Sequence, residues 1–222
     1  MNNIKVFSPA SVSNVCCGFD VLGFSIEGIG DDIFIQKSNS KGIKIKRTTG
    51  YEIPIDRKKN TACVAAKALL DYLNIDQGFD IEINKNIKPG SGIGSSAASA
   101  VGAVYGINKI LGSPLEKEEL LKFAMQGEFI SSKTAPADNV ASALYGGLIL
   151  VNNRENYKVV KLPVPKDLLA VVHHPLIEIK TSKSRSVLPK TVDINLASQQ
   201  LASMGGFIHS LHTENFNLMR LI

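Results

Sequence analysis

The sequence predicts an α+β fold built on a mixed sheet, and three observations support this class. Apolar and polar residues alternate with period two at residues 31–38, 42–48 and 79–87. Apolar residues recur every three or four positions at residues 95–111, which is the helical period. The two kinds of segment interleave without a repeating βαβ unit, so a mixed sheet is favoured over a doubly wound parallel one.

The first half of the chain begins with an expected strand at residues 4–11, followed by the strands at 31–38 and 42–48. Residues 60–73 are apolar nearly all round, which predicts a buried helix with Asn60 as its cap. The period-two pattern then returns at residues 79–87.

The second half begins with the helix at 95–111, which Gly112 ends. Ser113, Pro114 and Glu116 form a capping-box pattern that predicts a second helix over residues 113–132. The remaining expected elements are a short helix at 138–146, strands at 147–153, 157–165 and 168–175, and helical segments at 182–189, 194–212 and 214–222.

The composition is that of a globular protein with a sizeable core. Of the 222 residues, 44% are hydrophobic and 20% are charged, which argues against disorder. There is no tryptophan and the aromatic fraction is 6%, so an aromatic platform for single-stranded nucleic acid is not expected. The net charge of +5 suits an anionic ligand, but the lysines are spread over many segments and predict solvated surface rather than a nucleic-acid partner.

The three cysteines, Cys16, Cys17 and Cys63, lack the spacing of metal ligands. We expect buried free thiols in a reducing compartment. No signal-like leader and no apolar run of membrane-spanning length occurs in the sequence. We therefore expect a cytoplasmic protein with no membrane partner.

A glycine-rich loop precedes the helix at 95–111. Glycines at 90, 92 and 94 permit close backbone approach, and the helix start offers unpaired N–H groups and a positive dipole end, which together predict an anion site. A Walker A loop is excluded because no lysine follows Gly94. A dinucleotide fingerprint would need glycine at position 95, where this chain has serine, which argues against that pattern. No downstream protein-kinase signature is present. A glycine turn that only packs the helix onto the sheet is the alternative.

The stretch "PGSGIGSSAA", residues 89–98, resembles the phosphate loop of the GHMP kinases, which include galactokinases, homoserine kinases and mevalonate kinases. The resemblance implies a ribosomal-protein-S5-domain-2-like domain at residues 1–165 and the start of a ferredoxin-like domain at 166–222. It also implies an ATP-binding loop made of Pro89, Gly90, Ser91, Gly92, Ile93, Gly94, Ser95 and Ser96.

Four further stretches narrow the resemblance to homoserine kinases. "SPASVSNVCCGFDVLG" is similar to their N-terminal signature and implies that Asn14 and Asp20 hold the amino-acid substrate. "KNTACVAA" implies that Asn60 lies at the adenine pocket. "FAMQGEFISS" with "ADNVASALYGG", and "IKTSKSRSVLP", resemble the segments that supply Glu128, Thr181 and Arg185.

The resemblance implies ATP-dependent phosphorylation of the L-homoserine hydroxyl to O-phospho-L-homoserine, a step of threonine biosynthesis. Ser96 and Glu128 would hold Mg²⁺, and Thr181 would lie near the transferred phosphoryl group. Asp20 would pair with the substrate ammonium and Arg185 with its carboxylate.

Two residues are candidates for the catalytic role at the acceptor hydroxyl. Asp138 would act as a base, and Asn139 would instead orient the hydroxyl. Glu128 as a simple helix-face carboxylate, Asp20 as a turn residue and Arg185 as a solvated cation are the structural alternatives.

Two departures from the family pattern bear on the substrate and on activity. Pro136 stands where homoserine kinases usually carry histidine, which leaves a kinase for another small alcohol as the alternative. His173 and His174 are expected to be structural. Relatives are expected to continue beyond Ile222, so we expect an incomplete second domain. The chain would then be poorly active, a non-catalytic nucleotide-binding fragment, or self-associated as a homodimer.

Overall fold

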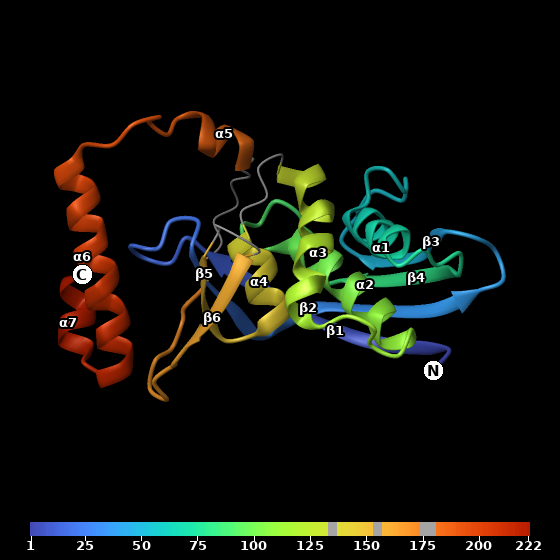
Figure 1. Ribbon diagram of the computed structural model, residues 1–222, viewed down its shortest axis with the longest axis horizontal. Coiled ribbons are helices and arrows are strands. Elements are labelled where there is room, and N and C mark those ends of the chain that lie inside the picture. Colours follow the sequence, from blue (N-terminus) through green and yellow to red (C-terminus); the bar gives the residue numbers. More distant parts are fainter. Residues whose placement is uncertain (133–136, 153–156, 174–180) are drawn as a thin grey trace.

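The computed structural model describes residues 1–132, 137–152, 157–173 and 181–222 (Figure 1). Within them one sheet runs in the order β3-β4-β2-β5-β6, and β1 also pairs with β2. All pairings are antiparallel except β3 with β4. The strands are β1 (Asn3–Ser13), β2 (Leu22–Ser38), β3 (Ile43–Gly50), β4 (Gly78–Lys85), β5 (Leu148–Asn152) and β6 (Lys158–Leu162). The predicted mixed α+β class is confirmed.

Six of the seven helices in the described part of the chain form two separate groups, and α5 lies between them (Figure 1). In the first group, α2 and α4 pack on β1 and β2, and α1 and α3 pack on α2. In the second group, α6 and α7 pack on each other beyond β5 and β6. The helices are α1 (Thr61–Tyr72), α2 (Ser95–Ile110), α3 (Lys117–Ser132), α4 (Ala137–Tyr145), α5 (Thr181–Ser186), α6 (Ile194–Thr213) and α7 (Phe216–Leu221).

The main core lies between the sheet and the first group of helices. The inner faces of β2 and β4 bury isoleucines at every second position, and α2 covers them with alanine, valine and isoleucine. A second, smaller cluster joins Leu22 of β2 and Leu148 of β5 to Phe207 and Leu211 of α6. This cluster attaches α6 to the end of the sheet. No helix in the described part of the chain is both long and apolar enough to cross a bilayer.

The expected helix start at Ser113 is wrong, because α3 begins only at Lys117. Ser113 has a φ of 60°, and its N–H donates to the Asn108 carbonyl at 2.8 Å, so it completes the end of α2 instead. The Glu119 carboxylate accepts from the Glu116 N–H at 3.1 Å and caps the new helix. The capping contact that forms therefore joins Glu116 and Glu119, three residues further along the chain than the expected one.

The strand expected at 168–175 is also not found. Residues 168–173 form no strand, Leu169 and Val171 are exposed, and no described residue pairs with this segment. A period-two pattern yields a strand only where a neighbouring strand accepts its hydrogen bonds. Residues 174 and 175 lie outside the described residues. The expectation of buried cysteines holds for Cys63, whereas Cys16 is exposed and Cys17 partly so.

Candidate phosphoryl-transfer site

The backbone of the loop between β4 and α2 is left-handed at its three glycines, as the sequence predicts. Gly90, Gly92 and Gly94 have φ values of 75°, 79° and 68°. Gly94 is the N-cap of α2, and a Cβ there would lie 2.0 Å from Ser11 Oγ and 3.3 Å from Asn139 Oδ1. Glycine is therefore required by both conformation and space. Since Gly94 has no side chain to cap the helix, the first N–H groups of α2 remain available to an anion.

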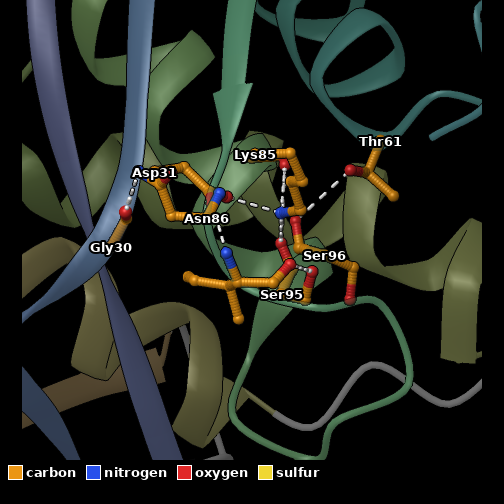
Figure 2. A network of polar contacts seen from close by, with 9 residues as sticks. Gly30, Asp31, Thr61, Lys85, Asn86, Ser95 and Ser96 are labelled. Atoms are coloured by element: carbon orange, nitrogen blue, oxygen red, sulfur yellow. Dashed lines mark hydrogen bonds and ion pairs between the residues drawn. The ribbon is translucent and has the colours of Figure 1, made fainter. Parts of the chain in front are cut away.

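A buried ion pair lies at the base of this loop, where its two ends meet (Figure 2). Lys85 and Asp31 have side chains that are 1% and 0% exposed, and Lys85 Nζ lies 2.5 Å from Asp31 Oδ2. The same ammonium donates to the Ser95 carbonyl at 2.5 Å and to Ser99 Oγ at 2.9 Å. Burial lowers the pKa of Lys85, and the carboxylate of Asp31 opposes that change.

Ser96 of α2 and Glu128 of α3 meet beside the loop. The Ser96 hydroxyl donates to the Glu128 carboxylate, and burial raises the pKa of Glu128 to about 7 against that hydrogen bond. No group of three or more histidine, cysteine or acidic side chains in the described ranges could enclose a metal ion. Two adjacent oxygen donors fit Mg²⁺, a hard cation that takes its other ligands from water and phosphate.

Asp138 and Asn139 lie in the first turn of α4, next to the glycine loop. The Asn139 amide accepts from Ser11 Oγ and donates to Ser13 Oγ, both at 2.9 Å, so it joins α4 to β1. Asp138 is fully buried, and this burial raises the pKa of its carboxyl to about 6. Its Oδ1 accepts the N–H of Asn139 at 2.9 Å, which opposes the rise. A buried carboxyl with a pKa near neutrality suits acid–base chemistry.

The loop between β1 and β2 carries the residues expected to hold the substrate. Asn14 and Asp20 both have positive φ values, of 58° and 60°, and Asn14 Oδ1 accepts the Asp20 N–H at 3.0 Å. Arg185 of α5 forms an ion pair with Asp20, and its guanidinium lies 5.5 Å from the ring centre of Phe19. Residues that are 165 positions apart in the chain therefore meet here.

The structure brings the two halves of the expected site together at Asp138. The charges of Asp20 and Arg185 and the backbone amide of Asn14 all act on the Asp138 carboxyl. Asn139 beside it adjoins Gly94 of the phosphate loop. The candidate substrate residues therefore lie next to the helix start that would receive the phosphates.

The structure tests the expectations for Asn60, Thr181 and Pro136 only in part. Asn60 caps α1 as expected: its Oδ1 accepts the Cys63 N–H at 3.1 Å, and its amide donates to the Pro54 carbonyl at 2.7 Å. Its place at an adenine pocket stays a prediction. The side chain of Thr181, the first residue of α5, lies outside the described residues, as does Pro136.

Sequence reasoning missed Lys85 and Asp31, although the sequence contains a signal for both. Lys85 continues the inward-facing series Phe79, Ile81 and Ile83 on β4, and Asp31 begins the equivalent series on β2. A charged residue at a position where the period-two pattern demands an apolar one indicates a buried pair.

Comparison with known proteins identifies similar sequences along nearly the whole chain. The family model of the GHMP kinases N terminal domain matches residues 60–147. A homoserine kinase of Chlorobium phaeobacteroides (strain DSM 266) is 36% identical over 231 residues, covering 99% of this chain and 72% of that protein. A homoserine kinase of Methanococcus vannielii is 35% identical, covering 98% of this chain and 72% of its own length.

Solved structures also match this chain along nearly its whole length. A crystal structure of homoserine kinase from Cytophaga hutchinsonii matches with a TM-score of 0.89 and 42% identity, over 99% of this chain and 70% of that one. A mevalonate kinase of L. major crystallised with R-mevalonate matches with a TM-score of 0.66, over 97% of this chain and 71% of that one. Its 17% identity is a likeness of fold alone.

Proposed function

This chain belongs to the homoserine kinase family, and we propose that the residues around its glycine loop carry out the family's phosphoryl transfer. The chain has the GHMP kinase fold, and its substrates are ATP and L-homoserine. The products are ADP and O-phospho-L-homoserine, which we place in threonine biosynthesis. The ferredoxin-like nature of residues 166–222 and the domain boundary at 165 stay predictions.

One observation carries the assignment of roles: α4 contacts both parts of the site. Asn139 adjoins Gly94 at the start of α2, and its neighbour Asp138 is within the electrostatic reach of Asp20 and Arg185. A phosphoryl donor on the loop and an acceptor held by these two side chains would meet at α4. Phosphoryl transfer needs this kind of positioning more than covalent chemistry.

Asp20 and Arg185 would hold the two charged groups of homoserine. In the structure described here they pair with each other, and they are 26% and 24% exposed, so a small ligand can reach them. The substrate ammonium would take the place of Arg185 beside Asp20, and the substrate carboxylate would take the place of Asp20 beside Arg185. The amino acid thus replaces one ion pair with two.

Asp138 is our candidate for the base. As the acceptor oxygen bonds to the γ-phosphorus, the bond from that phosphorus to the β-phosphate oxygen breaks, and the hydroxyl proton would pass to the Asp138 carboxylate. A pKa of about 6 leaves this group mostly ionised at neutral pH and still basic enough to accept a proton. Asn139 is less suited to orient the hydroxyl, because Ser11 and Ser13 occupy its amide.

The phosphates would lie against the N-terminus of α2, where the backbone N–H groups of the glycine loop and the helix dipole favour negative charge. Ser96 and Glu128 would hold Mg²⁺ there. When bound, the ion would neutralise charge on the phosphate oxygens. Thr181 begins α5 four residues before Arg185, and we place its role near the transferred group on family resemblance alone.

The test is the initial rate of ADP release from Mg·ATP with L-homoserine, mevalonate or galactose as acceptor. We expect release that depends on L-homoserine and not on the other two alcohols. Release that depends on another alcohol would show that the acceptor has changed, with Pro136 as the first residue to replace by histidine. ADP release that no acceptor alters would contradict the proposal.

A further inference from the structure

We propose that the buried Asp31–Lys85 pair is a positioning clamp that holds both ends of the glycine loop in the conformation that binds the nucleotide phosphates. The inference rests on the proposed function, because it assumes that this loop receives ATP. It assigns a role to two residues that touch neither the candidate acceptor site nor the tip of the loop.

Lys85 fixes the end of the loop where α2 begins. Its ammonium donates to the Ser95 carbonyl in the first turn of the helix and to Ser99 Oγ one turn later. Both contacts are buried. Because Ser95 directly follows the N-cap Gly94, these two hydrogen bonds of Lys85 set the direction in which the free N–H groups of α2 point.

Asp31 fixes the other end of the loop, where β4 ends. Its Oδ1 accepts the N–H groups of Asn86 at 2.9 Å and Ile87 at 3.0 Å, while Oδ2 holds Lys85. Ser95 Oγ then donates to the Ile87 carbonyl at 2.9 Å, which joins the two ends directly. Figure 2 shows these contacts converging from β2, β4 and α2. The entry and the exit of the loop are therefore both held by one ion pair, and the Ser95–Ile87 hydrogen bond adds to it.

The pair acts mainly by position, since its ammonium makes no contact that a nucleotide could replace. Its charge also lowers the pKa of Glu128, the candidate Mg²⁺ ligand beside the loop. A lysine ammonium has three N–H donors, and Asp31, Ser95 and Ser99 accept all three. The side chain is 1% exposed, and the adjacent carboxylate balances its charge. Lys85 therefore cannot reach a phosphate without giving up a buried hydrogen bond.

The experiment measures the affinity of this chain for ADP and for adenosine, before and after Lys85→Met. We expect ADP affinity to fall about tenfold or more while adenosine affinity stays within about twofold, since the clamp shapes the phosphate loop alone. With L-homoserine and ATP, KM for ATP should rise and KM for L-homoserine should not change. Lys5→Met is the matched control, because Lys5 pairs with Asp32, the neighbour of Asp31, at the surface, and we expect it to change neither affinity.

The double variant Asp31→Asn with Lys85→Met guards against loss of folding, because it leaves no unpaired buried charge. It should fold and show the same selective loss of ADP affinity. Equal losses for ADP and adenosine, an unchanged ADP affinity, or a double variant that does not fold would each overturn the clamp. A wild-type chain that binds neither ADP nor ATP would instead overturn the proposed function, and the clamp with it.

Discussion

Replacing Asp138 by asparagine should make the protein more stable and less active. The Asp138 side chain is fully buried, and its pKa is raised from 3.8 to about 6, mainly by burial. Each pKa unit corresponds to about 1.4 kcal/mol, so a difference of about two units means that the ionised carboxylate destabilises the folded state by about 3 kcal/mol. Asparagine keeps an oxygen that can accept the Asn139 N–H and carries no charge.

The pH dependence follows from proton binding. The folded state binds the Asp138 proton more tightly than the unfolded chain does. The stability that this group contributes is therefore fully present below about pH 4 and is lost as the pH rises through 6. At pH 8 the variant should therefore be more stable than the wild type by about 3 kcal/mol, roughly 6 to 12 °C in Tm for a chain of this size. At pH 5 about half of the difference should be left, and below pH 4 almost none.

The assay is thermal and urea unfolding of both proteins at pH 8, 5 and 4, with turnover measured at pH 8. We expect turnover to fall about 100-fold or more if Asp138 removes the hydroxyl proton. Asp167→Asn, at an exposed position, is the control and should show no such pH-dependent gain. A variant that is less stable than the wild type at pH 8, or a difference that does not change with pH, would refute the reasoning.

Three further predictions concern the loop, the acceptor and the metal. Gly94→Ala should weaken ADP binding and lower stability more than Gly92→Ala. Both glycines have positive φ, but only at Gly94 would an added Cβ clash with Ser11. Calorimetry of ADP binding and of unfolding for both variants checks this, and equal effects would contradict it. Arg185→Met should raise KM for L-homoserine about tenfold or more and leave KM for ATP unchanged, as steady-state kinetics will show. Glu128→Gln should abolish the increase of ATP affinity with Mg²⁺, and a variant that keeps this dependence would exclude Glu128 as a ligand.

Local patterns predicted much of the fold correctly. The isoleucine series of β2 and β4, the apolar face of α2 and the Asn60 cap of α1 are all where the sequence places them. Each depends on residues within a few positions of one another. The predicted start of α3 was wrong because a serine can begin a helix or follow the end of one. Here the hydrogen bond from the Ser113 N–H to the Asn108 carbonyl places Ser113 at the end of α2.

The site was predicted as a set of residues but not as an arrangement. The glycine loop and the residues around Asp20, Asp138 and Arg185 could be recognised in the sequence. The pairing of Asp20 with Arg185 across 165 positions, and the raised pKa of Asp138, arise only when α4, α5 and the β1–β2 loop come together. The period-two pattern marks Lys85 and Asp31 as inward-facing, but their pairing with each other depends on the β2–β4 register, which one sequence does not specify.

The most direct test of the account is to identify the product by phosphorus NMR after incubating the chain with Mg·ATP and L-homoserine. The account predicts a phosphomonoester of L-homoserine, formed in equal amount with ADP, in the wild type and far more slowly in Asp138→Asn. ADP accompanied only by inorganic phosphate, or no ADP at all, would contradict it.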